Sequence, residues 1–402
     1  MSERYVGGWE QAGLFNPLNA PSGSPYTQYS GTWTLSQASD AVAQGKWPTV
    51  KYLHLLAWGN NNFGQLGLNN TTFYSSPKQV GTYTTWSKIS CNGINNSSIK
   101  TDGTLWAWGY NSQGQLGLGN TTNYSSPKQV GALTNWSSIS TGNQYITAIK
   151  TDGTLWAWGS NSFGQLGLGN ITEYSSPKQV GALTNWSSIS SSSIFVLAIK
   201  TDGTLWSWGY NGSGQLGLGN RTSYSSPKQV GSLTNWLKIT TASQFSFAIK
   251  TDGTLWAWGT NIFGVLGLGN STYYSSPKQV GSLTTWLNIS AGAYESGAVK
   301  TDGTLWTWGH NNFGELGLGN RSSYSSPQQL GALTNWLTVS AGQYYQFAIK
   351  TNGTLWSWGN NTYGVLGLGN STYYSSPKQV GSLTTWTVIS CGSNSVTAIA
   401  ST

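Results

Sequence analysis

The chain has 402 residues, a formal net charge of +8, and charged residues at only 7% of its positions. Its 23 Trp and 21 Tyr supply large apolar surfaces to bury, which excludes a disordered chain. The two cysteines lack metal-ligand spacing, and no apolar run resembles a signal peptide or reaches the roughly 20 residues of a membrane span. We therefore expect no metal site, no cofactor and no insertion into a membrane.

In chain order, residues 1–50 come first and lie outside the pattern that follows. They begin as a Gly- and Pro-containing stretch that we interpret as an extended arm. A short helix of about two turns is predicted next, with Ser36 as N-cap, Gly45 at its C-terminal end and Pro48 preventing continuation. Such a helix is too short to be stable alone, so it must pack on something. Trp9, Trp33 and Trp47 are the candidate anchor residues.

Residues 31–48 read GTWTLSQASDAVAQGKWP. The G-x-W-T-L start, the short helical segment and the closing G-x-W-P resemble a segment near the start of many phage tail and other virion structural proteins. This resemblance implies that residues 1–50 attach the chain to a virion. The alternative is that the segment only connects the arm to the rest of the chain.

From residue 51 onward, a unit of fifty residues recurs without insertion or deletion. A Trp-Gly pair marks each of the seven copies, at Trp58, Trp108, Trp158, Trp208, Trp258, Trp308 and Trp358. A fixed period of about 40 to 50 residues, rich in short strands, is typical of a β-propeller.

Four strands are predicted in each copy, as in one propeller blade. In the best-defined repeats they cover residues 104–108, 128–130 after Pro127, 136–140 and 145–150. The Asp-Gly pair at 152–153 and its equivalents predict a two-residue hairpin turn. The run GQLGLGN lacks the Lys-Ser/Thr of a phosphate-binding loop, so we assign it to packing between blades.

The two ends of the repeat region predict how the ring closes. The first copy lacks the TDGTL sequence, and the last copy stops where the next one would begin. One blade should therefore combine the strand near 395–400 with the strand near 52–58, which removes the exposed sheet edges. The predicted fold is all-β: a seven-bladed β-propeller over residues 51–402, closed by its terminal strands, preceded by the arm of residues 1–50.

The repeat resembles the regulator-of-chromosome-condensation repeat family. The resemblance rests on DGTLWAWG, the following N-x-x-G-Q-L-G-L-G, the SPKQV stretch and a small-residue turn before AIK, over about 350 residues. It implies a seven-bladed propeller. The histidine that commonly follows the small-residue turn in that family is absent, and Asn95, Tyr145, Phe195, Phe245, Glu295, Tyr345 and Ser395 hold its place. Family membership alone does not transfer the exchange activity on a small GTPase.

The distribution of charge does not favour nucleic acid as a partner. Twelve of the nineteen basic residues sit at two repeated positions, that of Lys78 and that of Lys100, and an Asp or Asn follows two residues after the second. Such alternating rings indicate a solvated surface rather than a phosphate track. The two histidines, His54 and His310, lie at non-equivalent positions, so no catalytic set can be assembled and we expect no enzyme activity.

The copies differ most in the five residues before AIK, and more mildly after the Trp-Gly pair and at residues 121–123 and their equivalents. A constant frame with varied loops is how a rigid scaffold presents a recognition surface. The candidate ligand-binding residues are Tyr145, Phe195, Phe245, Tyr294, Tyr344 and Tyr345. The alternative is that the varied residues fill a central channel.

These observations favour a virion protein, a tail fibre or adhesin whose residues 1–50 join other virion or assembly proteins. Its propeller would bind a host surface glycan or protein, because aromatic rings stack on sugars and Asn, Gln and Ser bind hydroxyls. A purely structural virion decoration or assembly protein and a cytoplasmic interaction scaffold are the alternatives. The expected location is the virion, or the cytoplasm for the scaffold, and the sequence leaves homo-oligomerisation open.

Overall fold

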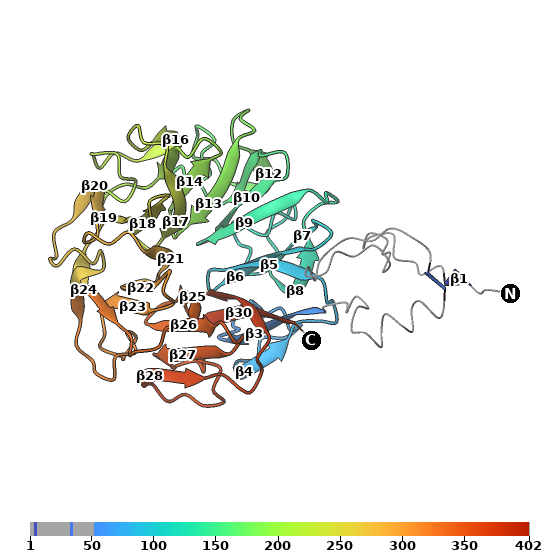
Figure 1. Cartoon of the computed structure of the whole chain (residues 1–402). Coiled ribbons are helices and arrows are strands. Elements are labelled where there is room, and N and C mark those ends of the chain that lie inside the picture. Colours follow the sequence, from blue (N-terminus) through green and yellow to red (C-terminus); the bar gives the residue numbers. More distant parts are fainter. Residues whose placement is uncertain (1–3, 6–32, 35–51, 402) are drawn as a thin grey trace. The chain divides into compact units, whose positions relative to one another are not determined.

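The computed structural model describes residues 4–5, 33–34 and 52–401, and the chain divides into two units, residues 1–51 and 52–402 (Figure 1). In the first unit, β1 (Arg4–Tyr5) pairs with β2 (Trp33–Thr34) in antiparallel orientation. The predicted helix after Ser36 and the anchor residues Trp9 and Trp47 lie outside the described residues, and only the backbone is described at Trp33. No helix in the described residues is long and apolar enough to cross a membrane.

The second unit consists of seven four-stranded antiparallel sheets, which are the blades of the propeller (Figure 1). The closing blade contains β29 (Trp386–Cys391), β30 (Ser395–Ser401), β3 (Leu53–Gly59) and β4 (Tyr74–Gln79). The next two contain β5 (Trp86–Cys91), β6 (Asn95–Lys100), β7 (Leu105–Gly109) and β8 (Tyr124–Gln129), then β9 (Trp136–Gly142), β10 (Tyr145–Lys150), β11 (Leu155–Gly159) and β12 (Tyr174–Gln179).

The remaining four blades follow in chain order. They contain β13 (Trp186–Ser191), β14 (Phe195–Lys200), β15 (Leu205–Gly209) and β16 (Tyr224–Gln229); β17 (Trp236–Thr241), β18 (Phe245–Lys250), β19 (Leu255–Gly259) and β20 (Tyr274–Gln279); β21 (Trp286–Ala291), β22 (Glu295–Lys300), β23 (Leu305–Gly309) and β24 (Tyr324–Gln329); and β25 (Trp336–Ala341), β26 (Tyr345–Lys350), β27 (Leu355–Gly359) and β28 (Tyr374–Gln379). A short 3₁₀ helix, η2 (Ile262–Gly264), follows β19.

Each blade presents loops at two opposite faces of the propeller. The first strand of each blade lines the central channel, and the chain then runs outward through the sheet to the fourth strand. The turn between the first two strands and the long loop between the last two, such as residues 160–173, lie on one face, which we call the long-loop face. The turn between the middle strands and the connection to the next blade lie on the other, the hairpin face.

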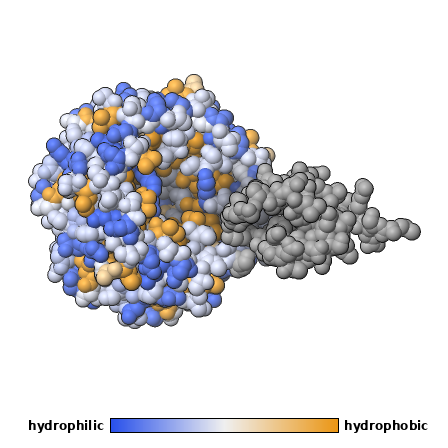
Figure 2. Space-filling view, viewed as in Figure 1, coloured by the Kyte–Doolittle hydropathy of each residue, from blue (hydrophilic) through white to orange (hydrophobic). Residues whose placement is uncertain are grey.

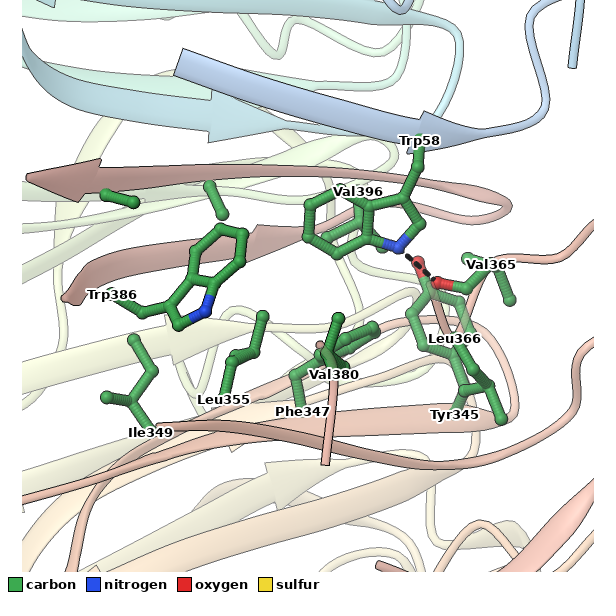
Figure 3. Close-up of a cluster of buried hydrophobic side chains, with 12 residues drawn as sticks. Trp58, Tyr345, Phe347, Ile349, Leu355, Val365, Leu366, Val380, Trp386 and Val396 are labelled. Carbon is green, nitrogen blue, oxygen red and sulfur yellow. Dashed lines mark hydrogen bonds between the residues drawn. The ribbon is translucent and has the colours of Figure 1, made fainter. Parts of the chain in front are cut away.

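The predicted closure of the ring is confirmed. β3 pairs with β30 over seven residue pairs, from Leu53 opposite Ser401 to Gly59 opposite Ser395, so one blade is built from both ends of the repeat region (Figure 1). Val396 and Ala398 from β30 pack in one hydrophobic cluster with Trp58 from β3 (Figure 3). The pairing of β3 with β30 therefore provides hydrogen-bond partners for the backbone of both strands and also completes the hydrophobic core of this blade.

The turn between the middle strands has three residues rather than the predicted two. In the first complete hairpin, Lys100 N–H donates to Thr104 O at 3.0 Å, which leaves Thr101, Asp102 and Gly103 as the loop. Gly103 adopts φ +77° because the third residue of such a loop is left-handed. Asp102 Oδ1 accepts from both the N–H and the hydroxyl of Thr104. An Asp-Gly pair thus occupies the second and third positions of a longer loop.

The outermost strand begins earlier than predicted and contains the proline. β8 runs from Tyr124 to Gln129, so Pro127 lies within it rather than before it. An edge strand tolerates proline because one side of it needs no ladder hydrogen bonds.

The Trp-Gly pair and the glycine-rich run join neighbouring blades, as predicted for the latter. At all seven junctions the indole Nε1–H of the Trp donates to a backbone carbonyl of the neighbouring blade, at 2.7 to 3.0 Å; Figure 3 shows the bond from Trp58 to Val365. Gly117 lies so near the indole of Trp158 that an added Cβ would be 2.6 Å from Nε1. The repeated glycines therefore let the blades approach closely enough for these bonds.

The ring of lysines represented by Lys150 is buried, and the prediction of a solvated surface was wrong there. Lys150 is 7% exposed, and its Nζ lies 3.7 Å from the ring centroid of Trp156 and 5.1 Å from that of Trp136. The same arrangement recurs at Lys100, Lys200, Lys250, Lys300 and Lys350. A long side chain can bury its stem on aromatic rings and place its charge against their faces.

Candidate functional site: an aromatic surface on the long-loop face

Four of the six predicted ligand-binding residues lie in the core between blades. The side chains of Tyr145, Phe195, Phe245 and Tyr345 are fully buried. They open the second strand of their blades, so the varied residues before AIK are mostly strand residues and not loops. A ligand at the surface cannot touch these four rings.

Two of the buried tyrosines bind the neighbouring blade through their hydroxyls. Tyr145 Oη donates to Phe195 O at 2.8 Å, and Tyr345 Oη donates to Gly392 O at 2.7 Å. The variation at these positions therefore changes the packing between blades. It neither exposes a loop nor fills the central channel.

The central channel is lined by small side chains from the first strands. It has a volume of about 550 Å³, and Figure 2 shows the hollow near the middle of the ring. Hydroxyls from these strands accept backbone N–H groups of the next blade: Thr141 N–H donates to Ser90 Oγ at 2.9 Å, and Ser191 N–H to Ser140 Oγ at 2.7 Å. The same bond recurs at Thr241, Ala341, Cys391 and Cys91. The hydroxyls thus contribute to holding the ring together.

The other two predicted residues, Tyr294 and Tyr344, are partly exposed on the long-loop face and contact each other. Their rings are stacked, with centroids 5.3 Å apart and an interplanar angle of 20°. They occupy the equivalent turn position in two neighbouring blades. Tyr344 has φ +66°, a left-handed conformation that is uncommon for a residue with a side chain.

Further aromatic residues extend this pair into a continuous surface. The ring of Phe313 lies 5.1 Å from that of Tyr344 and 5.8 Å from that of Tyr373. Phe263 lies 6.1 Å from Tyr294, and its side chain is 47% exposed. We call this set the aromatic surface: Phe263, Tyr294, His310, Phe313, Tyr344 and Tyr373.

His310 is the buried centre of the aromatic surface. Its ring lies 4.7 Å from that of Phe263 and 5.4 Å from that of Tyr344, and only 6% of the residue is exposed. Nδ1 of His310 contacts Oε1 of Glu315 in an ion-pair geometry. Glu315 Oε2 also accepts from the N–H of Phe313 at 2.8 Å, so the carboxylate holds both the histidine and the loop.

A second buried acid, Glu295, lies next to Tyr294. Burial, and after it the charge of Glu315, raises the pKa of Glu295 well above its ordinary value. Its Oε2 accepts from Tyr294 N–H at 3.1 Å, while Oε1 has no hydrogen-bond partner among the described residues. Glu295, His310 and Glu315, each of which occurs in only one copy of the repeat, therefore lie together at the aromatic surface.

The sequence indicated part of this surface and missed the rest. Variation after the Trp-Gly pair and at the third varied set pointed to His310 and Tyr373. Phe263 and Phe313 were missed, although their repeat position holds an aromatic residue in five copies and a Gln or Ser in the other two. The contact between Tyr294 and Tyr344, which belong to different blades, can be predicted only once the arrangement of the blades around the propeller is known.

The composition of the aromatic surface suits the binding of a partner. The described residues contain no group of three or more His, Cys, Asp or Glu side chains placed to hold a metal ion. Exposed Tyr and Phe rings supply flat apolar surfaces with polar edges, which suit a glycan or a protein partner.

Comparison with known proteins identifies the repeat. The family model described as the regulator of chromosome condensation (RCC1) repeat matches residues 54–93, 102–149, 152–199, 202–249, 252–299, 302–349 and 352–399. A second model of the same description matches residues 136–165, 186–215 and 337–365. No curated protein sequence matches the chain. The matched residues begin at 54, so the resemblance of the N-terminal segment to virion proteins stays a prediction.

Solved structures share the fold. Prp20p from Saccharomyces cerevisiae, described with its binding to Gsp1p and histones, has a TM-score of 0.79 at 20% identity, covering 88% of this chain and 92% of its own. A yeast RCC1 (Prp20) structure bound to Kap60 gives 0.78 at 20% identity, with coverages of 88% and 89%. Human WBSCR16 gives 0.79 at 19% identity, with coverages of 88% and 99%. At such identities the likeness shows the fold alone.

Proposed function

The chain belongs to the RCC1 repeat family, and we propose that its propeller is a recognition module. We propose that the aromatic surface of this propeller binds a glycan or protein on the surface of a host cell. The observation that carries the proposal is the gathering of varied, exposed aromatic side chains on one face of an otherwise near-identical frame. Rigid rings lose little conformational freedom on binding, so they contribute strongly to an interface.

We further propose that the module is a tail-fibre or adhesin component of a virion, attached through residues 1–50. The position of the first propeller strand supports this arrangement. Leu53 pairs with Ser401 and forms a bridge to Thr85, so the chain enters the propeller on the hairpin face. The aromatic surface lies on the opposite, long-loop face.

An interaction scaffold is the second candidate. It is favoured by the fold shared with Prp20p, which is described as binding Gsp1p and histones. The two candidates differ in the kind of ligand and not in the binding surface.

Binding of the labelled full chain to a panel of intact bacterial cells tests the proposal. We expect saturable binding to a subset of the panel. Periodate treatment of the cells destroys glycans and protease treatment removes proteins, so the treatment that abolishes binding identifies the ligand class. Absence of saturable binding across the panel would contradict the adhesin and leave the scaffold.

A further inference from the structure

A groove lies at the junction between the blade of β21 to β24 and the blade of β25 to β28. Its lining differs from that of the equivalent groove one blade earlier. It has a volume of about 420 Å³, and its walls include Leu318, Leu330, Leu333, Trp336, Trp356 and Lys350. We call it the Lys350 groove. Its volume is in the range of small-molecule sites, which begins at about 300 Å³.

The equivalent groove one repeat earlier provides an internal comparison. It has a volume of about 310 Å³ and is lined by the corresponding residues Leu268, Leu283, Trp286 and Trp306. Lys300, which corresponds to Lys350, does not line it. The apolar walls therefore repeat, whereas of these two grooves only the Lys350 groove is also lined by its lysine.

The repeat also loses a counter-charge at this groove. Lys100, Lys150, Lys200, Lys250 and Lys300 are each followed two residues later by an Asp, whose attraction partly offsets the lowering of the lysine pKa by burial. Asn352 takes the place of that Asp after Lys350, and burial alone lowers the pKa of Lys350. The buried cation of this blade has no acid partner of this kind.

The substitution of Asp by Asn keeps the turn and changes the charge. Asn352 Oδ1 accepts from the N–H of Thr354 at 3.2 Å and from its hydroxyl at 2.8 Å, as Asp does in the other blades. The ammonium of Lys350 stays 4.0 Å from the ring centroid of Trp356 and 4.8 Å from that of Trp336. The cation is thus held at an apolar wall, where an ionic contact is weakly screened.

A polar donor in the same wall adds to this arrangement. The indole Nε1 of Trp336 is buried and has no hydrogen-bond partner in the described part of the chain. The same is true of the equivalent Trp in every other blade, so this donor is a general feature, and of the two grooves compared only the Lys350 groove is also lined by a lysine.

We propose that the Lys350 groove binds an organic carboxylate with an apolar body of about the size of an amino-acid side chain. The carboxylate would pair with the ammonium of Lys350, and the apolar body would pack between Trp336, Trp356 and the leucines. The source of such a group is a free organic acid or the C-terminal residue of a peptide. This site is separate from the aromatic surface, so the inference does not depend on the proposed function.

Titration of the full chain with 4-phenylbutyrate and with its neutral amide, followed by ligand-observed NMR, tests the inference. We expect the acid to bind at least about tenfold more tightly than the amide, since a hydrogen bond to a charged group is worth about that much. Equal binding of acid and amide, or no binding of the acid, would overturn the proposal.

Asn352→Asp is the sharpest variant, because it restores the residue that five other blades carry and should leave the fold intact. We expect it to weaken binding of 4-phenylbutyrate about tenfold, as Lys350→Met should, while Lys300→Met should leave it unchanged. Undiminished binding by Asn352→Asp would refute the site. The affinities of N-acetyl-Gly-Gly-Phe and N-acetyl-Phe distinguish a peptide C-terminus from a free organic acid as the natural ligand. A site for a peptide C-terminus should bind the longer probe more tightly.

Discussion

Glu295 stands where four of the other six blades place a tyrosine or phenylalanine, and the oxygen next to its carboxyl group suits a hydroxyl donor. An added Cβ on Gly292 would meet both Glu295 Oε1 and the carbonyl oxygen of Gly342, so the two oxygens border the same small space. At the equivalent junction, Tyr345 Oη donates to Gly392 O. A protonated Glu295 can supply the same kind of donor, whereas an ionised one would place two acceptors together.

The stability of the protein should therefore depend on the pH through Glu295. Because the pKa of this carboxyl is raised in the folded state, its contribution is complete below the unfolded value and is lost as the pH rises toward the folded value. Above pH ~4.5 the free energy of unfolding of the native protein should fall relative to that of Glu295→Gln, by at most about 1.4 kcal/mol per pH unit. Urea denaturation between pH 4 and 8 measures this difference. Parallel curves would show that Glu295 keeps an ordinary pKa.

The spacing of the repeats also predicts the state of the two cysteines, Cys91 and Cys391. Their equivalent positions in the first and seventh copies place them on adjacent blades, where such positions are usually too far apart for a disulfide, so the spacing predicts free thiols. Cys91 and Cys391 are indeed free. Burial raises the pKa of the Cys91 thiol to about 11, which makes it a poor nucleophile at neutral pH.

At the scale of the strand and turn, the glycine of each hairpin meets two constraints, and a glycine in the connection between blades allows them to be separated. Gly203 has φ +76°, and an added Cβ would clash with the carbonyl of Thr234, which lies in the connection to the next blade. Gly231 has φ +62° but has nothing within 4 Å of an added Cβ.

Gly203→Ala should therefore destabilise the protein more than Gly231→Ala. The second variant bears only the cost of a left-handed alanine, about 1 kcal/mol, whereas the first adds a displacement of the neighbouring backbone. Thermal unfolding of both variants measures the difference. Equal losses would mean that contact between the blades does not constrain the hairpin.

The sequence predicted most of the strands because the Trp-Gly and Asp-Gly signals are local. It misplaced the start of the outer strand, since Pro127 reads as a boundary unless the strand is known to be an edge. It also assigned Tyr145 and Phe195 to a ligand-binding surface, although a strand was predicted to begin at Tyr145. Aromatic residues among Ser, Asn and Gln suit a recognition loop and a blade interface equally well, and only the packing of neighbouring blades separates the two.

At the scale of the whole molecule, the ring depends on its last strand. β30 lies between β29 and β3, and its side chains belong to two hydrophobic clusters, one with Trp58 and one with Trp108. Removing residues 395–402 would separate β29 from β3 and expose two sheet edges.

We expect this truncation to lower the melting temperature by more than about 10 °C, because several buried side chains costing about 2 kcal/mol or more each are lost together. Differential scanning calorimetry, with light scattering to detect association through the exposed edges, measures both effects. A truncated chain that melts with the full-length protein would contradict closure by the terminal strands.

The central claim is that the propeller binds through the aromatic surface, and two matched phenylalanines allow a direct test. Phe263 and Phe163 hold the same repeat position, are 47% and 44% exposed, and pack on the following blade at His310 and Tyr210. Phe263 belongs to the aromatic surface and Phe163 lies outside it. The measurement is the affinity of Phe263→Ala and Phe163→Ala for the bacterial cells that the native chain binds. The account predicts a loss of about tenfold for Phe263→Ala and none for Phe163→Ala, and equal affinities of the two variants would contradict it.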